Sequence, residues 1–280
     1  MHLLAVLMVL GLAWVIRSQS DLGQGTWNER WQKSLFLLVF PPLLILSTAT
    51  AILYMGCHGA MLGMKAGSWG CAISASILVL ALVCLVRLVH QASQSIRQLT
   101  NYQKDTIEGI SANIIHTQSL YSAQVGFWQS ELVISQGLLN TFDAPHLKAV
   151  LAHEQAHVYY RDTFWFFWLG WLRSCTAWLP KTQMIWRELL LLRELRADSK
   201  AAQSVDFLLL AESLLTVAKH PLQHSPVACA NLNDDMVGDR LNERINSLLE
   251  KSETVNSNSW QQWRWISLVL LPLFTIPLHS

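Results

Sequence analysis

The chain has 280 residues, of which 52% are hydrophobic and only 14% are charged. A soluble domain has about 25% charged residues, so we expect a sizeable part of this chain to lie in lipid. Twenty Lys and Arg balance nineteen Asp and Glu, for a net charge of +1, and this balance argues against a nucleic-acid partner.

Three apolar segments predict an N-terminal membrane region with three spans. They are residues 1–16, 35–55 and 69–86. Because about 20 residues cross the hydrocarbon core, the second segment is long enough, whereas the other two need flanking residues or a thin bilayer.

Loop charges predict how these spans are oriented. Basic residues occur between the first two spans and again after residue 87, whereas the loop between the second and third spans has only Lys65. The positive-inside rule then places residues 17–34 and the chain after residue 87 in the cytoplasm. Cys57 and Cys71 flank the outer loop and could form a disulfide in an oxidising compartment. We favour the alternative, in which Cys57 and Cys71 are unpaired and serve as small apolar residues at the ends of the spans.

The chain after the spans is predicted to contain a strand and several helices. Gln91–Asn113 is polar and expected to be helical, and Val125–Ser135 has the aromatic and β-branched composition of a strand. Asp143 can cap a helix that begins at Ala144 and runs to about Asp162. Further helices are expected at residues 183–204, 206–219 and 239–251, with an irregular segment at residues 220–238.

Two apolar stretches lie outside the N-terminal spans. Residues 163–179 are aromatic, with tryptophans at helical spacing, but their length and Arg173 argue against a clean crossing. An interfacial or re-entrant helix is therefore favoured over a fourth span. Residues 260–280 are expected to form a final span or a surface anchor.

These elements predict a mainly α-helical, multi-span membrane protein in three parts. Residues 1–90 form the membrane region, residues 91–259 form a cytoplasmic-side domain with a small β-sheet and the aromatic stretch, and residues 260–280 form the C-terminal anchor.

The strongest chemical signal is the run His153-Glu154-Gln155-Ala156-His157. On a helix, His153 and His157 share a face, so their imidazoles can bind one Zn²⁺. Glu154 can take a proton from the zinc-bound water and pass it to a leaving amine. The pattern therefore predicts a zinc site for peptide-bond hydrolysis with Glu154 as the catalytic residue.

A catalytic zinc needs a third protein ligand. A histidine six residues after His157 is excluded, because Thr163 stands there. Glu194 is the next candidate, and Asp198, one helical turn later, could accept a hydrogen bond from a ligating histidine and fix its tautomer. The alternative for Glu194 is a charged helix face paired with arginine, and Glu188 is a weaker ligand candidate.

The run from Leu151 to Asp162, followed by Glu194-x-x-x-Asp198, resembles the BlaR/MecR-type membrane metallopeptidases. Those are the signal-transducing proteases of β-lactam sensing and their relatives. Sensor members carry an extracellular ligand-binding domain after the last span. The sequence ends at Ser280, so we expect this chain to lack such a domain.

The resemblance implies a gluzincin-like metallopeptidase domain whose active site faces the cytoplasm at the inner membrane. It assigns His153, His157 and Glu194 to Zn²⁺ and Glu154 to catalysis. It also implies a regulatory or signalling endopeptidase that acts near the membrane surface. A cytoplasmic regulator, a membrane protein or the chain itself could be the substrate, and membrane lipid and a separate sensor protein are expected partners.

Three other classes of function are alternatives. The prenyl-protein and heat-shock membrane proteases, which act in protein quality control, share both motifs, but the heat-shock branch has two clear spans between them. A non-catalytic zinc-binding membrane scaffold would keep the same residues. A transporter is disfavoured, because the predicted spans carry almost no ionisable residues.

Two finer roles are open from the sequence. Val125–Ser135 could be a sheet edge to which a substrate adds as a strand, or an interior strand. Arg244 could stabilise the scissile carbonyl in the transition state, with a solvated helix charge as the alternative. Other candidates for that role are Arg240, His220, His224 and Tyr159.

Overall fold

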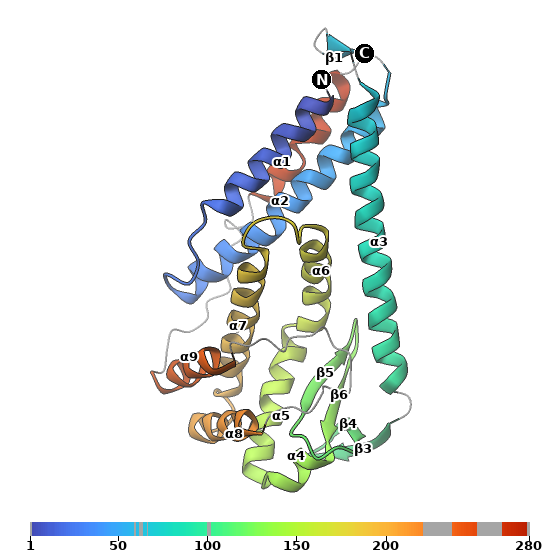
Figure 1. The fold of residues 1–280 in the computed structure, drawn as a ribbon. Coiled ribbons are helices and arrows are strands. Elements are labelled where there is room, and N and C mark those ends of the chain that lie inside the picture. Colours follow the sequence, from blue (N-terminus) through green and yellow to red (C-terminus); the bar gives the residue numbers. More distant parts are fainter. Residues whose placement is uncertain are drawn as a thin grey trace. The chain divides into compact units, whose positions relative to one another are not determined.

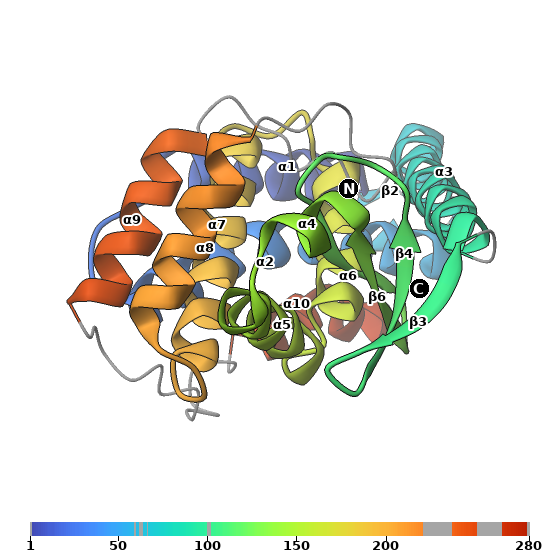
Figure 2. The ribbon, with the colours of Figure 1, turned by 90° about the horizontal axis from the view of Figure 1, so that it is seen from below.

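The computed structural model describes residues 2–58, 60–61, 64–65, 67–99, 102–220, 237–250 and 265–278. These residues form a mainly helical fold with one four-stranded sheet and one short hairpin (Figures 1 and 2). In chain order the elements are α1 (His2–Ser18), α2 (Trp27–Met55), β1 (Ala60–Met61), β2 (Met64–Lys65), α3 (Ser68–Leu99), β3 (Gln103–Ile107), β4 (Ile110–Ile115), β5 (Ser122–Gly126), β6 (Ser130–Ser135), α4 (Gln136–Thr141), α5 (Ala144–Tyr159), α6 (Asp162–Cys175), α7 (Thr182–Ala201), α8 (Phe207–Lys219), α9 (Val237–Leu249), α10 (Ile266–Val269) and the 3₁₀ helix η2 (Leu271–Leu278).

The chain divides into two compact units. Unit 1 comprises residues 1–87, 168–190 and 256–280, and unit 2 comprises residues 88–167 and 191–255. The division falls within α3, α6 and α7, so each of these helices contributes residues to both units.

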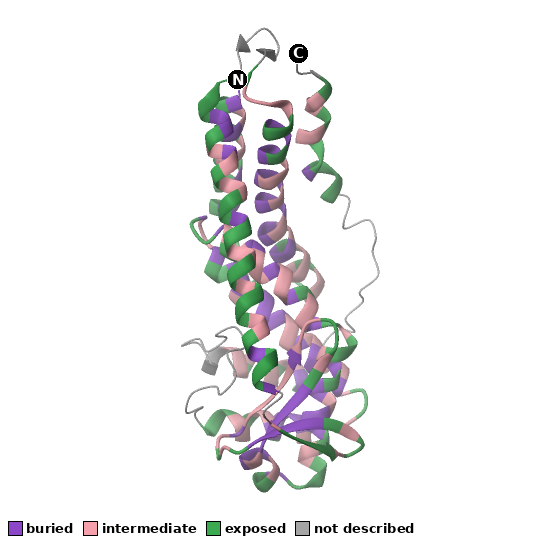
Figure 3. Cartoon of the chain, turned by 90° about the vertical axis from the view of Figure 1, so that its right-hand side faces the viewer, coloured by how far each residue is buried: buried purple, intermediate pink, exposed green. Residues whose placement is uncertain are grey.

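Two helices are long and apolar enough to cross a membrane. They are α2, with 29 residues, and α3, with 32 residues. The helix α2 begins with a capping box, in which the Thr26 side chain accepts from Glu29 N and the Glu29 carboxylate accepts from Thr26 N. Few residues of the apolar part of α3 are buried, and most are coloured as exposed or intermediate (Figure 3). The first predicted span is the helix α1, which is apolar but has only 17 residues.

The end of α3 differs from the prediction. The helix continues to Leu99, and the expected helix over Gln91–Asn113 is wrong beyond that residue, because β3 and β4 follow as an antiparallel pair. Glu108 and Gly109 join these strands with positive φ values of 49° and 80°. Two consecutive left-handed residues form the tight turn that antiparallel strands favour, and this turn chemistry was not recognised in the sequence.

Cys57 and Cys71 form a disulfide, with their Cα atoms 5.8 Å apart. This separation lies within the range that a disulfide spans. The prediction that they are two unpaired apolar residues is therefore wrong. The bond joins the end of α2 to the start of α3.

The aromatic stretch forms the 14-residue helix α6, followed by a turn into α7. At 1.5 Å per residue such a helix is about 21 Å long, less than the roughly 30 Å hydrocarbon core. Within unit 1, the turn that follows α6 contacts the end of α1: Arg17 Nη1 donates to Thr182 Oγ1 at 2.9 Å, and Lys181 Nζ donates to Ser20 O at 2.6 Å. The C-terminal helices α10 and η2 have only 4 and 8 residues.

Unit 2 is built around a sheet with the strand order β3-β4-β6-β5. The strands β4 and β6 pair in parallel, and the other two pairs are antiparallel. The predicted strand Val125–Ser135 is in fact the end of β5, a turn and the interior strand β6. The edge interpretation of Leu132 and its neighbours is therefore wrong, and β5 is the edge strand on this side of the sheet.

The two faces of the sheet are covered by different helices. Leu132 and Ile134 pack with Val150 and Leu151 of α5 on one face, whereas Val133 packs with Leu99 of α3 on the other. Burial on both faces explains why β6 reads as a continuous apolar run. The arrangement fixes α5 against the sheet, beside the edge strand β5.

The remaining helices of unit 2 follow the sequence prediction closely. Asp143 caps α5 by accepting a hydrogen bond from His146 N, and α8 begins after its cap residue Asp206. The helices α5, α8 and α9 pack together around small and branched side chains, among them Ala149, Leu210 and Leu248. The expected irregular segment at residues 220–238 lies largely outside the described residues.

Candidate metal centre

The helix α5 presents two histidines to the interior of unit 2. His153 and His157 lie one turn apart, and their rings are 4.7 Å apart between centroids. His153 and the adjacent Glu154 are buried. Their position follows from the helix period, which puts residues i and i+4 on one face, while Val150 and Leu151 on the neighbouring positions pack against the sheet.

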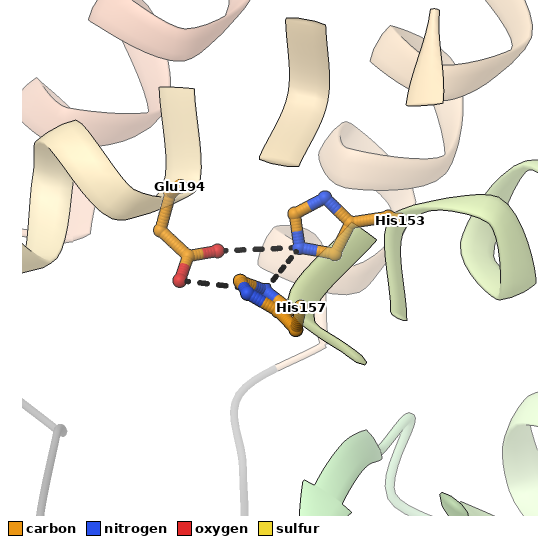
Figure 4. A group of neighbouring side chains, drawn as sticks. All are labelled: His153, His157 and Glu194. Carbon is orange, nitrogen blue, oxygen red and sulfur yellow. Dashed lines mark hydrogen bonds and ion pairs between the residues drawn. The ribbon is translucent and has the colours of Figure 1, made fainter. Parts of the chain in front are cut away.

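Glu194 of α7 meets both histidines, as Figure 4 shows. The two Nε2 atoms are 3.1 Å apart, and the Glu194 carboxylate oxygens lie 3.3 Å from His153 Nε2 and 3.7 Å from His157 Nε2. A zinc ion bonded at about 2.0–2.1 Å to tetrahedrally arranged donors separates them by about 3.3 Å. These three side chains therefore fit one metal ion, and they form a group that could hold one.

Each histidine has a carboxylate beside its other ring nitrogen. His157 Nδ1 lies 2.7 Å from Asp162 Oδ2, in a hydrogen bond. His153 Nδ1 lies 2.8 Å from Asp198 Oδ1, as an ion-pair contact rather than a well-directed hydrogen bond. A carboxylate at Nδ1 favours the tautomer that leaves Nε2 free for a metal.

Arginines neutralise these carboxylates in turn. Arg244 of α9 donates from Nε and Nη2 to Asp198 at 2.7 and 2.9 Å, and its Nη1 lies 3.5 Å from Glu194 Oε2. Arg196 pairs with Asp162 and stacks 4.0 Å from the Tyr160 ring centroid. The centre thus rests on two Arg–Asp–His chains, one for each histidine.

The surrounding charges show that the cluster favours a cation. Burial lowers the pKa of the His153 imidazole, but the charges of Asp198 and Glu194 outweigh burial and raise this pKa to about 10. Burial likewise lowers the pKa of His157, and Glu194 and Asp162 raise it by more. Carboxylates that hold protons on a buried and a half-buried imidazole will also favour a metal ion that replaces those protons.

The carboxylates themselves stay ionised despite their burial. Burial raises the pKa of Glu194, but Arg193 and the two histidines hold it well below its usual value. Burial also raises the pKa of Asp198, and Arg244 lowers it by more. An anionic oxygen is therefore available on Glu194 as a donor.

Glu154 points to the edge of the sheet. Ser122 Oγ, at the start of β5, donates a hydrogen bond of 2.7 Å to Glu154 Oε1. This contact fixes one carboxylate oxygen of Glu154 beside the edge strand. Glu154 lies next to His153 in the chain and does not belong to the three-residue donor group.

The other candidates from the sequence lie elsewhere. Glu188 belongs to unit 1, where it accepts from Arg30 Nε at 2.6 Å. Tyr159 is exposed beneath Lys200, and His220 Nδ1 contacts Thr216 O at the exposed end of α8. Arg240 is only half-buried on α9, and His224 lies outside the described residues.

Three residues around the centre were missed by the sequence reasoning: Ser122, Asp162 and Arg196. Asp162 stands five residues after His157, and a carboxylate so close to a ligating histidine could have been weighed as its partner. No sequence signal marks Ser122 or Arg196, because their contacts depend on how β5 and α7 pack beside α5.

Comparison with known protein families indicates which reaction this group of residues serves. Residues 87–221 match the family model of peptidase family M48. The match covers just under half of the chain and includes the histidine pair, Glu154, Glu194 and Asp198. It supports the M48 metallopeptidase family and indicates a metal-dependent peptidase. The comparison with curated proteins gave no match.

Proposed function

We propose that this chain is a zinc endopeptidase that cleaves protein substrates at a membrane surface. The observation that carries the proposal is the convergence of His153, His157 and Glu194 at separations that suit one zinc ion, with Glu154 beside them. The family match to metallopeptidases supports the same chemistry.

Glu154 is proposed as the proton carrier of the reaction. Zinc bound to the three donors would polarise the scissile carbonyl and lower the pKa of a bound water to about 7. Glu154 accepts a proton from the attacking water and delivers it to the leaving amine. Because Ser122 holds Oε1, Oε2 is the oxygen left to exchange the proton.

The edge strand β5 is the proposed binding surface for the substrate backbone. It pairs with β6 on one side, and no other described strand pairs with its outer edge. An extended peptide could add there through backbone hydrogen bonds. The bond between Ser122 and Glu154 then ties the substrate-binding edge to the catalytic carboxylate.

Arg244 is better explained as a positioning residue than as a donor to the scissile carbonyl. All three of its guanidinium nitrogens face Asp198 or Glu194. Because the Arg244 guanidinium contacts both carboxylates, it orients Asp198 and Glu194. Through Asp198 it also orients the His153 ring. Its role in stabilising the transition state is then indirect.

We further propose that the protein is a multi-pass protein of the inner (cytoplasmic) membrane with its active site on the cytoplasmic side. The apolar helices α2 and α3 support membrane insertion. The Cys57–Cys71 disulfide supports an oxidising environment for the loop between them, which is the loop that the charge distribution places outside. A regulatory substrate, a separate sensor protein or self-cleavage remains part of this proposal.

The BlaR/MecR type is the narrower family assignment that we favour. Between the two zinc motifs the structure has one 14-residue helix, α6, whereas the heat-shock branch has two clear spans there. A quality-control protease of the prenyl-protein or heat-shock type is the alternative. A non-catalytic scaffold would keep the zinc donors but would not need Glu154 beside the edge strand.

Metal removal tests the proposal directly. The purified full chain should contain about one zinc per molecule and cleave labelled casein or itself. Treatment with 1,10-phenanthroline should abolish cleavage, and added Zn²⁺ should restore it. A chain that cleaves equally well after the metal has been removed would contradict a zinc peptidase.

Loss of the Ser122 hydroxyl should slow the reaction without weakening substrate binding. Ser122→Ala removes the hydrogen bond that orients Glu154 but keeps the backbone of β5. A hydrogen bond to a charged group contributes about 1.5–3 kcal/mol, so we expect kcat to fall about 10-fold or more. Steady-state kinetics should show an unchanged KM, and Ser130→Ala, at the start of β6, is the matched control. An unchanged kcat would rule out an orienting role for Ser122.

A further inference from the structure

Three large aromatic side chains are exposed around the start of α6. Tyr159 is 67% exposed, Trp128 is 66% exposed and Trp165 is 58% exposed. They come from the end of α5, the turn between β5 and β6, and the first turn of α6, and all belong to unit 2. Isolated exposed aromatic side chains are common, but three such side chains from neighbouring elements indicate an interaction surface.

Two of these rings carry a cation. The Arg161 guanidinium lies 5.3 Å from the Trp128 ring centroid, and Lys200 Nζ lies 4.7 Å from that of Tyr159. Within the part of the chain that the structure describes, neither cation has a carboxylate partner. We call Trp128, Tyr159, Arg161, Trp165 and Lys200 the aromatic belt.

The belt is held in place by ring contacts behind it. Phe127 packs against Phe164 and Phe167 with centroid distances of 5.1 and 4.9 Å, and Trp128 packs against Phe164 at 5.3 Å. The turn between β5 and β6 is therefore fixed to α6. These contacts hold the exposed Trp128 in place before any partner binds, and such preorganisation lowers the cost of binding.

We propose that the aromatic belt lies in the headgroup layer of a bilayer that contains anionic phospholipid. Tryptophan and tyrosine concentrate at this depth, because their rings are apolar and each has one polar group. Arginine and lysine can extend past such rings to reach phosphates. Lys200 Nζ donates to the neutral Gln203 Oε1 at 3.2 Å, so both cations keep a positive charge that no described carboxylate neutralises and that complements a negative surface. The chain also passes directly from Trp165 and its neighbours into unit 1, which contains α2 and residues 68–87 of α3.

This placement has a consequence for the substrate, and the consequence rests on the proposed peptidase function. Tyr159 of the belt follows His157 by two residues on α5, which is about 3 Å along the helix axis. A belt at headgroup depth therefore keeps the metal centre close to the membrane surface. The substrate class would be proteins with an extended segment next to their own membrane anchor.

Spin-label accessibility tests the placement without any need for catalysis. Trp128→Cys, Trp165→Cys and the control Asn140→Cys would be made separately in the full chain, with Cys84, Cys175 and Cys229 replaced by alanine. Asn140 is exposed and precedes α5, at the opposite end of that helix from Arg161. Each labelled chain would be reconstituted in vesicles of phosphatidylcholine and phosphatidylglycerol.

Labels at positions 128 and 165 should collide more with lipid-soluble oxygen than with a water-soluble nickel chelate, and the label at 140 should show the reverse. Equal nickel accessibility at 128, 165 and 140 would overturn the proposal. Shielding of 128 and 165 from both reagents would also overturn it, because a protein partner would then cover the belt.

A second measurement guards against misfolding of the labelled variants. Trp128→Ala should lower the cleavage of a lipid-anchored peptide on these vesicles at least 3-fold relative to the same peptide free in solution. An unchanged ratio of anchored to free peptide cleavage would contradict the placement of the belt at the membrane. If the wild-type chain cleaves neither peptide, the peptidase function is contradicted, and the accessibility result still tests the placement.

Discussion

Glu154→Gln should abolish proteolysis while zinc stays bound. Glutamine has nearly the same shape and can still accept the hydrogen bond from Ser122, but it cannot take up a proton. A general base contributes about 10²–10⁴-fold to a rate, so kcat should fall by at least 100-fold. The three donor atoms come from other residues, and zinc content should therefore be unchanged.

The measurement pairs zinc analysis with cleavage of labelled casein and of the chain itself. Gln155→Ala is the matched control, because Gln155 is the next residue on α5 and is exposed. Comparison of cellular proteins between the wild type and Glu154→Gln would then reveal the products that disappear. Undiminished cleavage by the variant would eliminate Glu154 as the base and favour a scaffold function.

The local signals in the sequence were sufficient for the helix that carries the histidines. Asp143 as a cap, Pro145 in the first turn and the apolar positions at 150 and 151 all agree with one helix, and α5 has the expected start. Agreement among capping, periodicity and composition makes such a segment predictable.

The sheet was harder to predict, because its strands depend on partners far away in the chain. The segment at 103–113 is polar enough to suit a helix, and only the turn at Glu108-Gly109 and pairing with β6 make it two strands. Val125–Ser135 has strand composition throughout, so the turn inside it was hidden by Phe127 and Trp128. Those two aromatic residues are explained by ring contacts with α6.

The residues around the metal centre were likewise predictable only in part, because some of their contacts depend on the fold. The spacing of His153 and His157 predicts one site, the need for a third ligand points to Glu194, and the structure brings the three together. The contacts of Arg196 with Asp162 and of Arg244 with Asp198 arise from helix packing. Spacing along one helix is local information, whereas a contact between helices needs the fold.

Glu194→Gln should weaken zinc binding and also destabilise the metal-free protein. A neutral amide is a poorer zinc donor than a carboxylate, and loss of a residue that only supports a ligand already weakens metal affinity about 10–100-fold. We therefore expect a loss of at least 100-fold in zinc affinity. In the metal-free state Glu194 pairs with Arg193 and Arg244 and lies between His153 and His157. Removal of one partner from a fully buried ion pair costs about 3–5 kcal/mol, and this half-buried site should lose less than that.

Two variants make this expectation specific. Glu194→Asp keeps the charge on a shorter side chain, so it should retain most of the stability and an intermediate zinc affinity. Glu212→Gln makes the same chemical change on an exposed carboxylate of α8. Its exposed ion pair with His146 contributes about 0–1 kcal/mol, so this control should keep its zinc affinity and nearly all of its stability. Zinc affinity can be measured by competition with a chelating dye and stability by thermal unfolding. Wild-type zinc affinity in Glu194→Gln would show that the third donor is another group, even if the histidines still bind the metal.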